Sequence, residues 1–358
     1  MMMLQLLFTA IVGLLVNVII TPLVIRFAHR NEWYDEQNHR KIHTADTPRI
    51  GGVGIYIGFL AAGAVALLFT DERSVFELLL HYLPVLGGLT LVHALGLVDD
   101  FRNLRAALKL VVQIGAALLV TTGPFRIERL TIPYVGYTVE LGVFSIVVTV
   151  LWIVAVSNAL NFIDGVDGLA GGHAMIAAAF FAAIAVLSGQ QLTALFAVGL
   201  VGATAGFLIY NMPPARIFMG DSGSYVLGFL LALFPLIPSG EPAARLSMLP
   251  AVTIVGFALL DMLTSVFRRI ARGKHPFSAD REHIHHKLID LGMGTGKILA
   301  MTYSASIVLG LAGVAWYLVA RDAATTIALV CWAIAALLLV LLNRAYHQLP
   351  PEELKQQG

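Results

Sequence analysis

The sequence predicts an all-α polytopic membrane protein with about eleven transmembrane helices, an outside N-terminus and an inside C-terminus. Three observations predict this class: 58% of the 358 residues are hydrophobic, only 13% are charged, and long apolar runs alternate with short polar segments. An average soluble protein has about 25% charged residues, so this chain has too few charges to cover a soluble globule. The composition excludes a disordered chain and an ordinary soluble enzyme, and it predicts lipid as a second solvent.

Eleven apolar runs are candidate spans, because a spanning helix needs roughly 20 apolar residues. They lie near residues 4–25, 52–70, 77–98, 107–123, 142–160, 172–188, 192–210, 224–240, 247–267, 298–320 and 323–343. The first run has no small-residue cleavage site and further spans follow it, so we expect a retained helix rather than a signal peptide. The segment near 124–141 alternates apolar and polar residues between Gly and Pro, which predicts a small external β-hairpin.

Lys and Arg indicate the orientation, because cytoplasmic loops carry an excess of them. With the N-terminus outside, 18 of the 23 Lys and Arg residues fall on the cytoplasmic side. We expect one membrane domain, 1–358, whose cytoplasmic active-site loops are 26–50, 99–109, 158–172, 211–224 and 268–297. A net charge of +1 argues against a nucleic-acid partner. The single cysteine, Cys331, cannot form an internal disulfide.

Two adjacent carboxylates, Asp99 and Asp100, end the third run, and Lys109 follows one turn into the next helix. Like charges this close raise one pKa or require a cation. The alternative is a polar connector in which the aspartates cap the fourth helix. Both interpretations of this cluster stay open.

Two further clusters contain carboxylates beside glycine. Asn161, Asp164 and Asp167 recur every three residues, so a helical end would place them on one face. Their spacing does not fit an EF-hand, which needs a twelve-residue loop ending in Glu. Asp221 lies in the stretch Phe218-Met-Gly-Asp-Ser-Gly-Ser, where an oxygen ligand at a helix start suits Mg²⁺ and phosphate. The alternative for Asp221 is a plain N-cap.

The most basic loop favours anion recognition, because Arg and His donate to phosphate and sugar oxygens. Its candidate ligands are Arg281, His283, His285 and His286. A zinc site is the weaker alternative, because no Cys is nearby and cations surround the histidines. A basic stretch precedes Thr47 and Arg49, and beside the other clusters we expect this segment to form one wall of the same site. Together the clusters predict metal-dependent phosphoryl chemistry on a lipid substrate at the cytoplasmic face.

At these motifs the chain resembles the polyprenyl-phosphate N-acetylhexosamine-1-phosphate transferase family over nearly its whole length. The motifs are Asp99-Asp100, Asn161-Phe-Ile-Asp164-Gly-Val-Asp167, Phe218-Met-Gly-Asp221 and His283-Ile-His-His-Lys. The His-Ile-His-His form is similar to the branch that uses UDP-GlcNAc and undecaprenyl phosphate. The sister branch, which loads MurNAc-pentapeptide, usually has Thr-Pro-Thr-Met-Gly-Gly where this chain has Thr47-Pro48-Arg49-Ile50-Gly51-Gly52.

The resemblance implies a role for each matching residue. It implies Mg²⁺, for which Mn²⁺ can substitute, with Asp221 and Asn161 as its ligands. It implies catalytic roles for Asp99, Asp100 and Asp164, with Asp99 as the candidate base and an aspartyl-phosphate path as the rival. The implied substrate-binding residues are Asp167 and Phe218 at the uracil, Lys109 at the polyprenyl phosphate, Arg281, His283, His285 and His286 at the sugar or diphosphate, and Thr47 and Arg49 at the nucleotide side.

The resemblance also implies the reaction and the partners. GlcNAc-1-phosphate would pass from UDP-GlcNAc to undecaprenyl phosphate in a bacterial plasma membrane, with membrane lipid as a further partner. Bare apolar faces predict a homodimer. Three alternatives stay open: a related donor such as UDP-MurNAc-pentapeptide, a secondary transporter, and an intramembrane aspartyl protease with Asp164 and Asp221 as its dyad.

Overall fold

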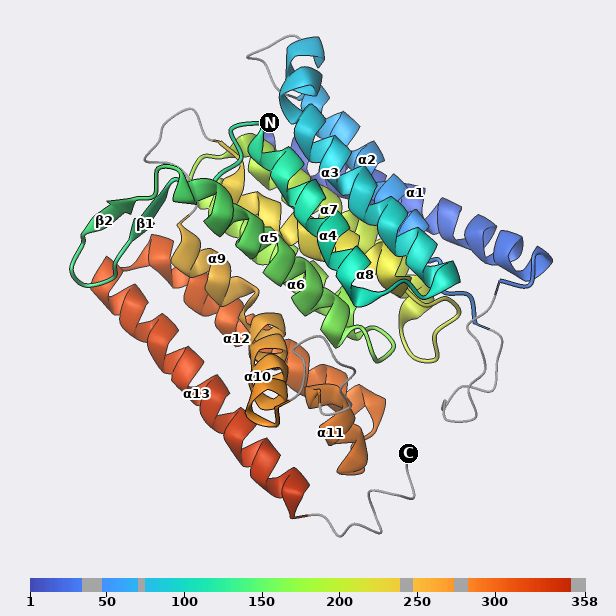
Figure 1. The fold of residues 1–358 in the computed structure, drawn as a ribbon. Helices are drawn as coiled ribbons and strands as arrows, with labels where there is room; N and C mark the ends of the chain where they lie inside the picture. Colours follow the sequence, from blue (N-terminus) through green and yellow to red (C-terminus); the bar gives the residue numbers. More distant parts are fainter. Residues whose placement is uncertain (34–46, 70–74, 239–246, 274–282, 349–358) are drawn as a thin grey trace.

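The computed structural model describes residues 1–33, 47–69, 75–238, 247–273 and 283–348, which form a bundle of helices (Figure 1). The helices are α1 (Met2–Arg30), α2 (Gly52–Leu68), α3 (Val75–Arg102), α4 (Ala106–Thr121), α5 (Phe144–Ile163), α6 (Leu169–Leu187), α7 (Gln191–Asn211), α8 (Gly220–Leu233), the 3₁₀ helix η1 (Phe234–Leu236), α9 (Met248–Ile254), α10 (Gly256–Ala271), α11 (Ile284–Asp290), α12 (Thr295–Leu318) and α13 (Arg321–His347).

Within the described residues, seven helices are long and apolar enough to cross a membrane, and an eighth span results if α9 and α10 count as one. Three shorter apolar helices, α2, α4 and α8 with η1, fall on other runs where spans are expected. The all-α membrane class is therefore confirmed. The count of eleven spans and the N-out, C-in orientation stay predictions.

The helix α8 forms the centre of the bundle, in contact with α2, α3, α5 and α6. Almost all of its residues are buried, including the large side chains of Tyr225 and Phe229. A helix that is apolar on every side is stable only when other elements surround it. The first turn of α8 carries Asp221, so this central position brings the ends of the neighbouring helices around that carboxylate.

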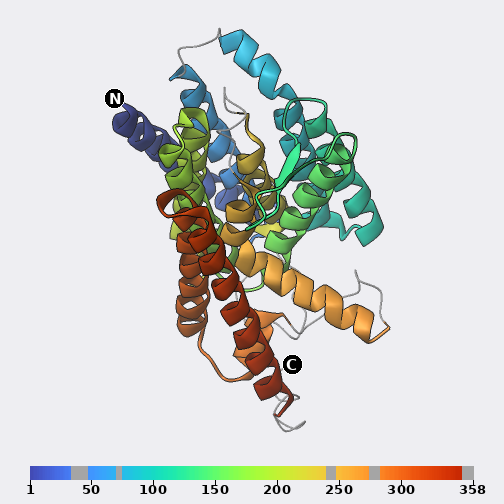
Figure 2. The same ribbon diagram turned by 90° about the vertical axis from the view of Figure 1, so that its left-hand side faces the viewer.

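The run near 247–267 is not one straight span. It forms α9 and α10, which meet at an angle of 77° at Val255, and Figure 2 shows α10 projecting sideways from the bundle. The sequence of α10 has two faces: Asp261, Ser265 and Arg269, four residues apart, are buried, whereas Leu263 and Phe267 are exposed. The polar face of α10 lies against the protein, where Asp261 contacts His283.

The predicted β-hairpin is confirmed as a two-stranded antiparallel sheet. Its strands β1 (Arg129–Thr131) and β2 (Thr138–Glu140) pair Arg129 with Glu140. At the edges of the bundle, α1 and α13 lie far apart (Figure 1), and both bury only a small part of their apolar surface inside the protein. This exposed apolar surface is what lipid covers in a membrane protein.

Candidate active site

The polar ends of α3, α4 and α8 meet at a cluster of Asp99, Lys109 and Asp221, which we call the carboxylate centre. Lys109 Nζ lies 2.8 Å from Asp99 Oδ2 and 3.2 Å from Asp221 Oδ2. Asp99 is buried, and its other oxygen accepts a hydrogen bond from the Leu104 amide at 2.6 Å. One cation therefore bridges two carboxylates that are far apart in the chain.

Asn161 extends the carboxylate centre from the last turn of α5. Its Nδ2 donates to Asp221 Oδ1 and to Ser224 Oγ, both at 3.0 Å. Because α5 ends at Ile163, Asp164 follows the helix and Asp167 lies in the turn before α6. The expectation that Asn161, Asp164 and Asp167 share one helical face is therefore wrong, since the helix is too short to include all three.

The residues around Asp221 fit Mg²⁺ in their chemistry. Asp221 offers carboxylate oxygens, the side-chain amide of Asn161 lies against them through its Nδ2, and Asp99 adds a second carboxylate on the same lysine. Among the described residues, no group of three or more His, Cys, Asp or Glu side chains is arranged to hold a metal ion by itself. Mg²⁺ typically binds one or two carboxylates and takes its other ligands from water and substrate phosphates, so this set suits Mg²⁺ better than zinc.

Asp100 is adjacent to Asp99 in the chain but contacts a different element. Its two carboxylate oxygens accept hydrogen bonds from the backbone amides of Asp221, at 2.7 Å, and Ser222, at 3.2 Å. Asp100 therefore caps the N-terminus of α8 from α3, so the capping interpretation holds for α8 instead of the fourth helix. Gly220 starts α8 with φ +71°, and a Cβ there would lie 2.1 Å from the Arg49 carbonyl oxygen, so only glycine fits.

Asp164 lies beside the carboxylate centre and is partly buried. Burial raises the pKa of Asp164 to about 7, the negative charge of Asp221 adds to the rise, and Arg49 opposes it. Asp164 therefore exists near neutral pH as both carboxylate and carboxylic acid. The structure places Arg49 close enough to influence this group, which agrees with a shared site.

The segment around Arg49 runs beside Phe218. The Phe218 amide donates to the Pro48 carbonyl at 2.7 Å, and the Gly51 amide donates to the Phe218 carbonyl at 3.0 Å. Thr47 is buried next to this pairing, and Phe218 is partly buried. Two segments that sequence reasoning assigned to one nucleotide pocket are therefore neighbours in space.

Asp167 is buried, and its Oδ2 accepts a hydrogen bond from the Ala215 amide at 3.0 Å. This bond attaches the turn between α5 and α6 to the loop that leads to Phe218. Asn211 strengthens the same connection, because its Oδ1 accepts from the Gly168 amide at 3.0 Å and its Nδ2 donates to the Ile217 carbonyl at 2.8 Å. Part of the role of Asp167 is therefore to hold these two loops together.

The histidines of α11 and its N-cap lie against the turn that carries Asp164. The ring centroids of His283 and Phe162 are 5.4 Å apart, and a Cβ on Gly165 would lie 2.2 Å from His285 Nε2. The ring of His286 is tilted against that of His285, with 4.3 Å between the ring centroids. Burial lowers the pKa of His285 to about 3, so this imidazole stays neutral at physiological pH. Arg281 lies outside the described residues.

Asp261 is a residue that sequence reasoning missed. It is buried in α10, and its Oδ2 lies 2.7 Å from His283 Nδ1 while its Oδ1 accepts from the Ile284 amide at 2.8 Å. A carboxylate on Nδ1 fixes the tautomer and the direction of an imidazole. The available signal was the polar spacing of Asp261, Ser265 and Arg269 at every fourth position in an otherwise apolar run.

The chain is similar to known proteins over most of its length. Residues 82–239 match the model of glycosyl transferase family 4. A Bacillus subtilis (strain 168) protein named "Probable undecaprenyl-phosphate N-acetylglucosaminyl 1-phosphate transferase" is 34% identical over 292 residues, which are 81% of this chain and 79% of that protein. The chain belongs to this family of polyprenyl-phosphate N-acetylhexosamine-1-phosphate transferases.

Two other family members show how broad the similarity is. The undecaprenyl-phosphate alpha-N-acetylglucosaminyl 1-phosphate transferase of Escherichia coli (strain K12) is 27% identical, over 78% of this chain and 75% of that protein. The phospho-N-acetylmuramoyl-pentapeptide-transferase of Staphylococcus carnosus (strain TM300) is 29% identical, over 85% of this chain and 97% of that protein. The chain described in Figure 1 has several helices that can cross a membrane, and its relatives are bacterial proteins, so it is a multi-pass protein of a bacterial membrane.

Proposed function

We propose that this family member transfers GlcNAc-1-phosphate from UDP-GlcNAc to undecaprenyl phosphate, which yields undecaprenyl-diphospho-GlcNAc and UMP. An oxygen of the lipid phosphate attacks the β-phosphorus of the donor. The bond from that phosphorus to the oxygen that bridges it to the α-phosphorus breaks, and UMP leaves with this oxygen. The names of the relatives in Bacillus subtilis and Escherichia coli, which contain both GlcNAc and undecaprenyl phosphate, support this assignment.

The observation that carries the proposal is the bridge of Lys109 between Asp99 and Asp221. A lysine placed between two carboxylates can also bind a phosphate oxygen, and a carboxylate that it releases needs another cation, which Mg²⁺ at Asp221 would supply. Lys109 would hold the phosphate of the lipid substrate. Asp99, which contacts Lys109, would take up any proton that this phosphate carries. Phosphate is already anionic at neutral pH, so most of the rate would come from positioning and charge stabilisation.

Mg²⁺ belongs to this proposal because the carboxylate centre offers oxygen ligands. Asp221 and Asn161 would hold the ion, and Mg²⁺ would supply neutralisation of the charge on the diphosphate. Asp100 keeps Asp221 in position by capping α8. Asn161 keeps the Asp221 carboxylate oriented through the bond at 3.0 Å.

The nucleotide and sugar would occupy the region between the Phe218 loop and α11. Phe218 would stack on the uracil, Asp167 would bond to its edge, and Thr47 and Arg49 would close this side. His283, directed by Asp261, would contact the sugar or diphosphate together with His286. The neutral His285 would contribute a hydrogen bond and shape instead of charge. Asp164 would line the same pocket.

The deciding experiment measures UMP release from a set of different UDP-sugar donors. Purified protein in nanodiscs with undecaprenyl phosphate and Mg²⁺ should release UMP from UDP-GlcNAc, and EDTA should stop the release. Preference for UDP-MurNAc-pentapeptide would contradict the proposed donor, and full activity in EDTA would contradict the metal. Uptake of a solute without lipid-linked sugar would favour the transporter, which the family membership disfavours.

A further inference from the structure

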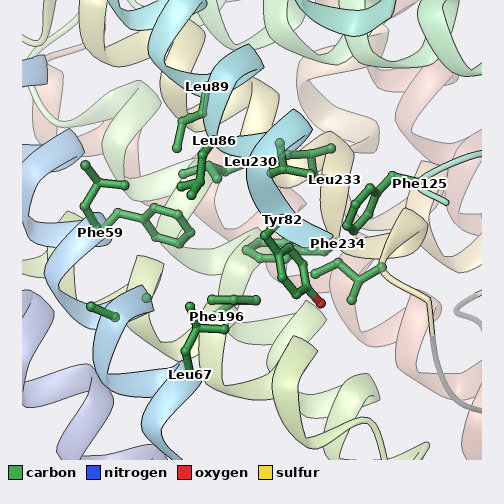
Figure 3. Close-up of a pocket in the computed structure, with 15 residues that line it drawn as sticks. Phe59, Leu67, Tyr82, Leu86, Leu89, Phe125, Phe196, Leu230, Leu233 and Phe234 are labelled. Atoms are coloured by element: carbon green, nitrogen blue, oxygen red, sulfur yellow. The ribbon is translucent and has the colours of Figure 1, made fainter. Parts of the chain in front are cut away.

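An apolar cavity lies among α2, α3, α7 and α8. Its volume is about 200 Å³, and Figure 3 shows side chains from these helices gathered around one space. Among the described residues that line it none is charged, and only Tyr82 has a polar side chain. The aromatic members are Phe59, Tyr82, Phe125, Phe196 and Phe234. A cavity with this lining does not hold ordered water, because water needs several polar partners.

The cavity is separated from the carboxylate centre. Leu89 lines it and Asp99 is ten residues further along α3, a distance of roughly 15 Å at 1.5 Å per residue. Between them, α3 contacts α8 so closely that a Cβ on Gly96 would lie 2.4 Å from the Ser222 amide nitrogen. His93 Nδ1 lies 3.2 Å from the Ser222 carbonyl oxygen in the same layer. Close packing of α3 against α8 therefore lies between the cavity and the carboxylate centre.

The cavity opens toward the membrane between α2 and α3. Its lining includes Leu60, Gly63 and Leu86, which are partly exposed, and Ala64, which is exposed. The surface around this opening is apolar, as the exposed Leu83 on α3 shows. For a protein that crosses a membrane, the molecules that face such an opening are lipids, and the part that faces it at this depth is hydrocarbon.

We propose that this cavity binds the end of an acyl chain of a membrane phospholipid. An empty void loses the dispersion contacts of every side chain that lines it, and a hydrocarbon chain restores them. A headgroup would find no charged partner in the cavity, so it stays at the membrane surface. The site is a structural lipid site, distinct from the sites for the donor and the acceptor of the transfer reaction.

A filling substitution tests the proposal. In Gly63→Leu, the new Cβ would lie 3.5 Å from Phe196 Cε1, an ordinary contact, and no backbone atom is among its neighbours, so the substitution adds side-chain volume at a residue that lines the cavity. Gly115→Leu is the matched control, because Gly115 is exposed on α4 and a Cβ there meets nothing within 4 Å. Native mass spectrometry of protein extracted in mild detergent should show one retained phospholipid for the wild type and for Gly115→Leu, and at least a tenfold lower occupancy for Gly63→Leu.

Photolabelling of the wild-type protein gives a second measurement that does not depend on the variants folding. In nanodiscs that contain a phospholipid with a diazirine at the acyl-chain end, adducts should form on peptides of α2, α3 and α8 that line the cavity. Equal lipid retention in Gly63→Leu and Gly115→Leu, or the absence of adducts in the wild type, would overturn the proposal. Adducts from a photoreactive polyprenyl phosphate but not from the phospholipid would also overturn it. Neither measurement requires transferase activity.

Discussion

At the scale of single residues, neighbours in the chain have different partners. Asp99 pairs with Lys109, whereas Asp100 binds the backbone of α8. The exposure of Asp221 is low, and both of its oxygens are in hydrogen bonds with side chains. We therefore expect substitution of Asp221 to act on the reaction and substitution of Asp100 to act on the position of α8.

Asp221→Asn should reduce UMP release by at least about 100-fold, because the neutral amide loses both the attraction to Lys109 and the charge offered to Mg²⁺. The similar shape of Asn should leave the fold intact, which the thermal unfolding midpoint checks. Asp322→Asn, at an exposed position at the start of α13, is the control and should retain the wild-type rate. A wild-type rate in Asp221→Asn would show that the reaction does not need the Asp221 carboxylate.

Asp261 should act through His283. Asp261→Asn leaves one acceptor oxygen where the carboxylate uses two, for the His283 ring and the Ile284 amide. The imidazole is then less firmly oriented, so kcat should fall by about 10–100-fold, as is typical when the partner of a functional histidine is weakened. The kcat of His283→Gln should fall by at least as much as that of Asp261→Asn.

The double variant Asp261→Asn/His283→Gln distinguishes positioning from general stability. If Asp261 acts only through His283, the double variant should have the same kcat as His283→Gln, because groups that act as one unit are not additive. Independent losses that multiply in the double variant would show that Asp261 has another role.

At the scale of elements, the turn between α5 and α6 and the bend between α9 and α10 bring the site together. The turn carries Asp164 and contacts His285 at Gly165. The bend directs Asp261 toward His283. The end of α5 and the last turn of α10 meet where Arg269 lies over the Phe162 ring, 5.4 Å from its centroid.

Gly165→Ala should reduce activity by about 100-fold, because its Cβ would lie 2.2 Å from His285 Nε2 and must displace either the histidine or the turn. Gly294→Ala, at the N-cap of α12, is the matched control, since a Cβ there meets nothing within 4 Å. UMP release measures both. Equal activity of the two variants would show that the contact between α11 and this turn has no part in the reaction.

At the scale of the whole molecule, the scarce charges are concentrated. The chain has 13% charged residues, yet the carboxylate centre and its neighbours Asp100 and Asp164 use several of them. The helices α1 and α13 at the edges contribute mainly apolar surface. The distribution of Lys and Arg predicts that the site faces the cytoplasm.

The predicted orientation can be measured with fusions at the C-terminus. A green fluorescent protein attached after Gly358 should fluoresce in cells, because an inside C-terminus keeps it in the cytoplasm where it folds. Alkaline phosphatase at the same position should be inactive, because it needs the oxidising outer compartment. An active phosphatase fusion with a dark fluorescent fusion would reverse the orientation of the chain.

The sequence by itself determined the class of the protein and the identity of the motifs. Composition and hydropathy are sums over local residues, so they predicted an α-helical membrane protein. The hairpin followed from its local alternation of residues. The motifs around Asp99, Asn161, Asp221 and His283 pointed to the family without any knowledge of contacts, because each motif is a short continuous segment.

Only the tertiary structure decided which of these residues are partners. The contacts Lys109–Asp221, Asp100–Ser222 and Asp261–His283 join residues on different elements, and no local pattern specifies which helix end lies beside which. The 77° bend was also hidden, because hydropathy averages over a helix and does not record which face is polar. The cavity depends on the shapes of side chains from four helices, so the packing of the bundle alone determines it.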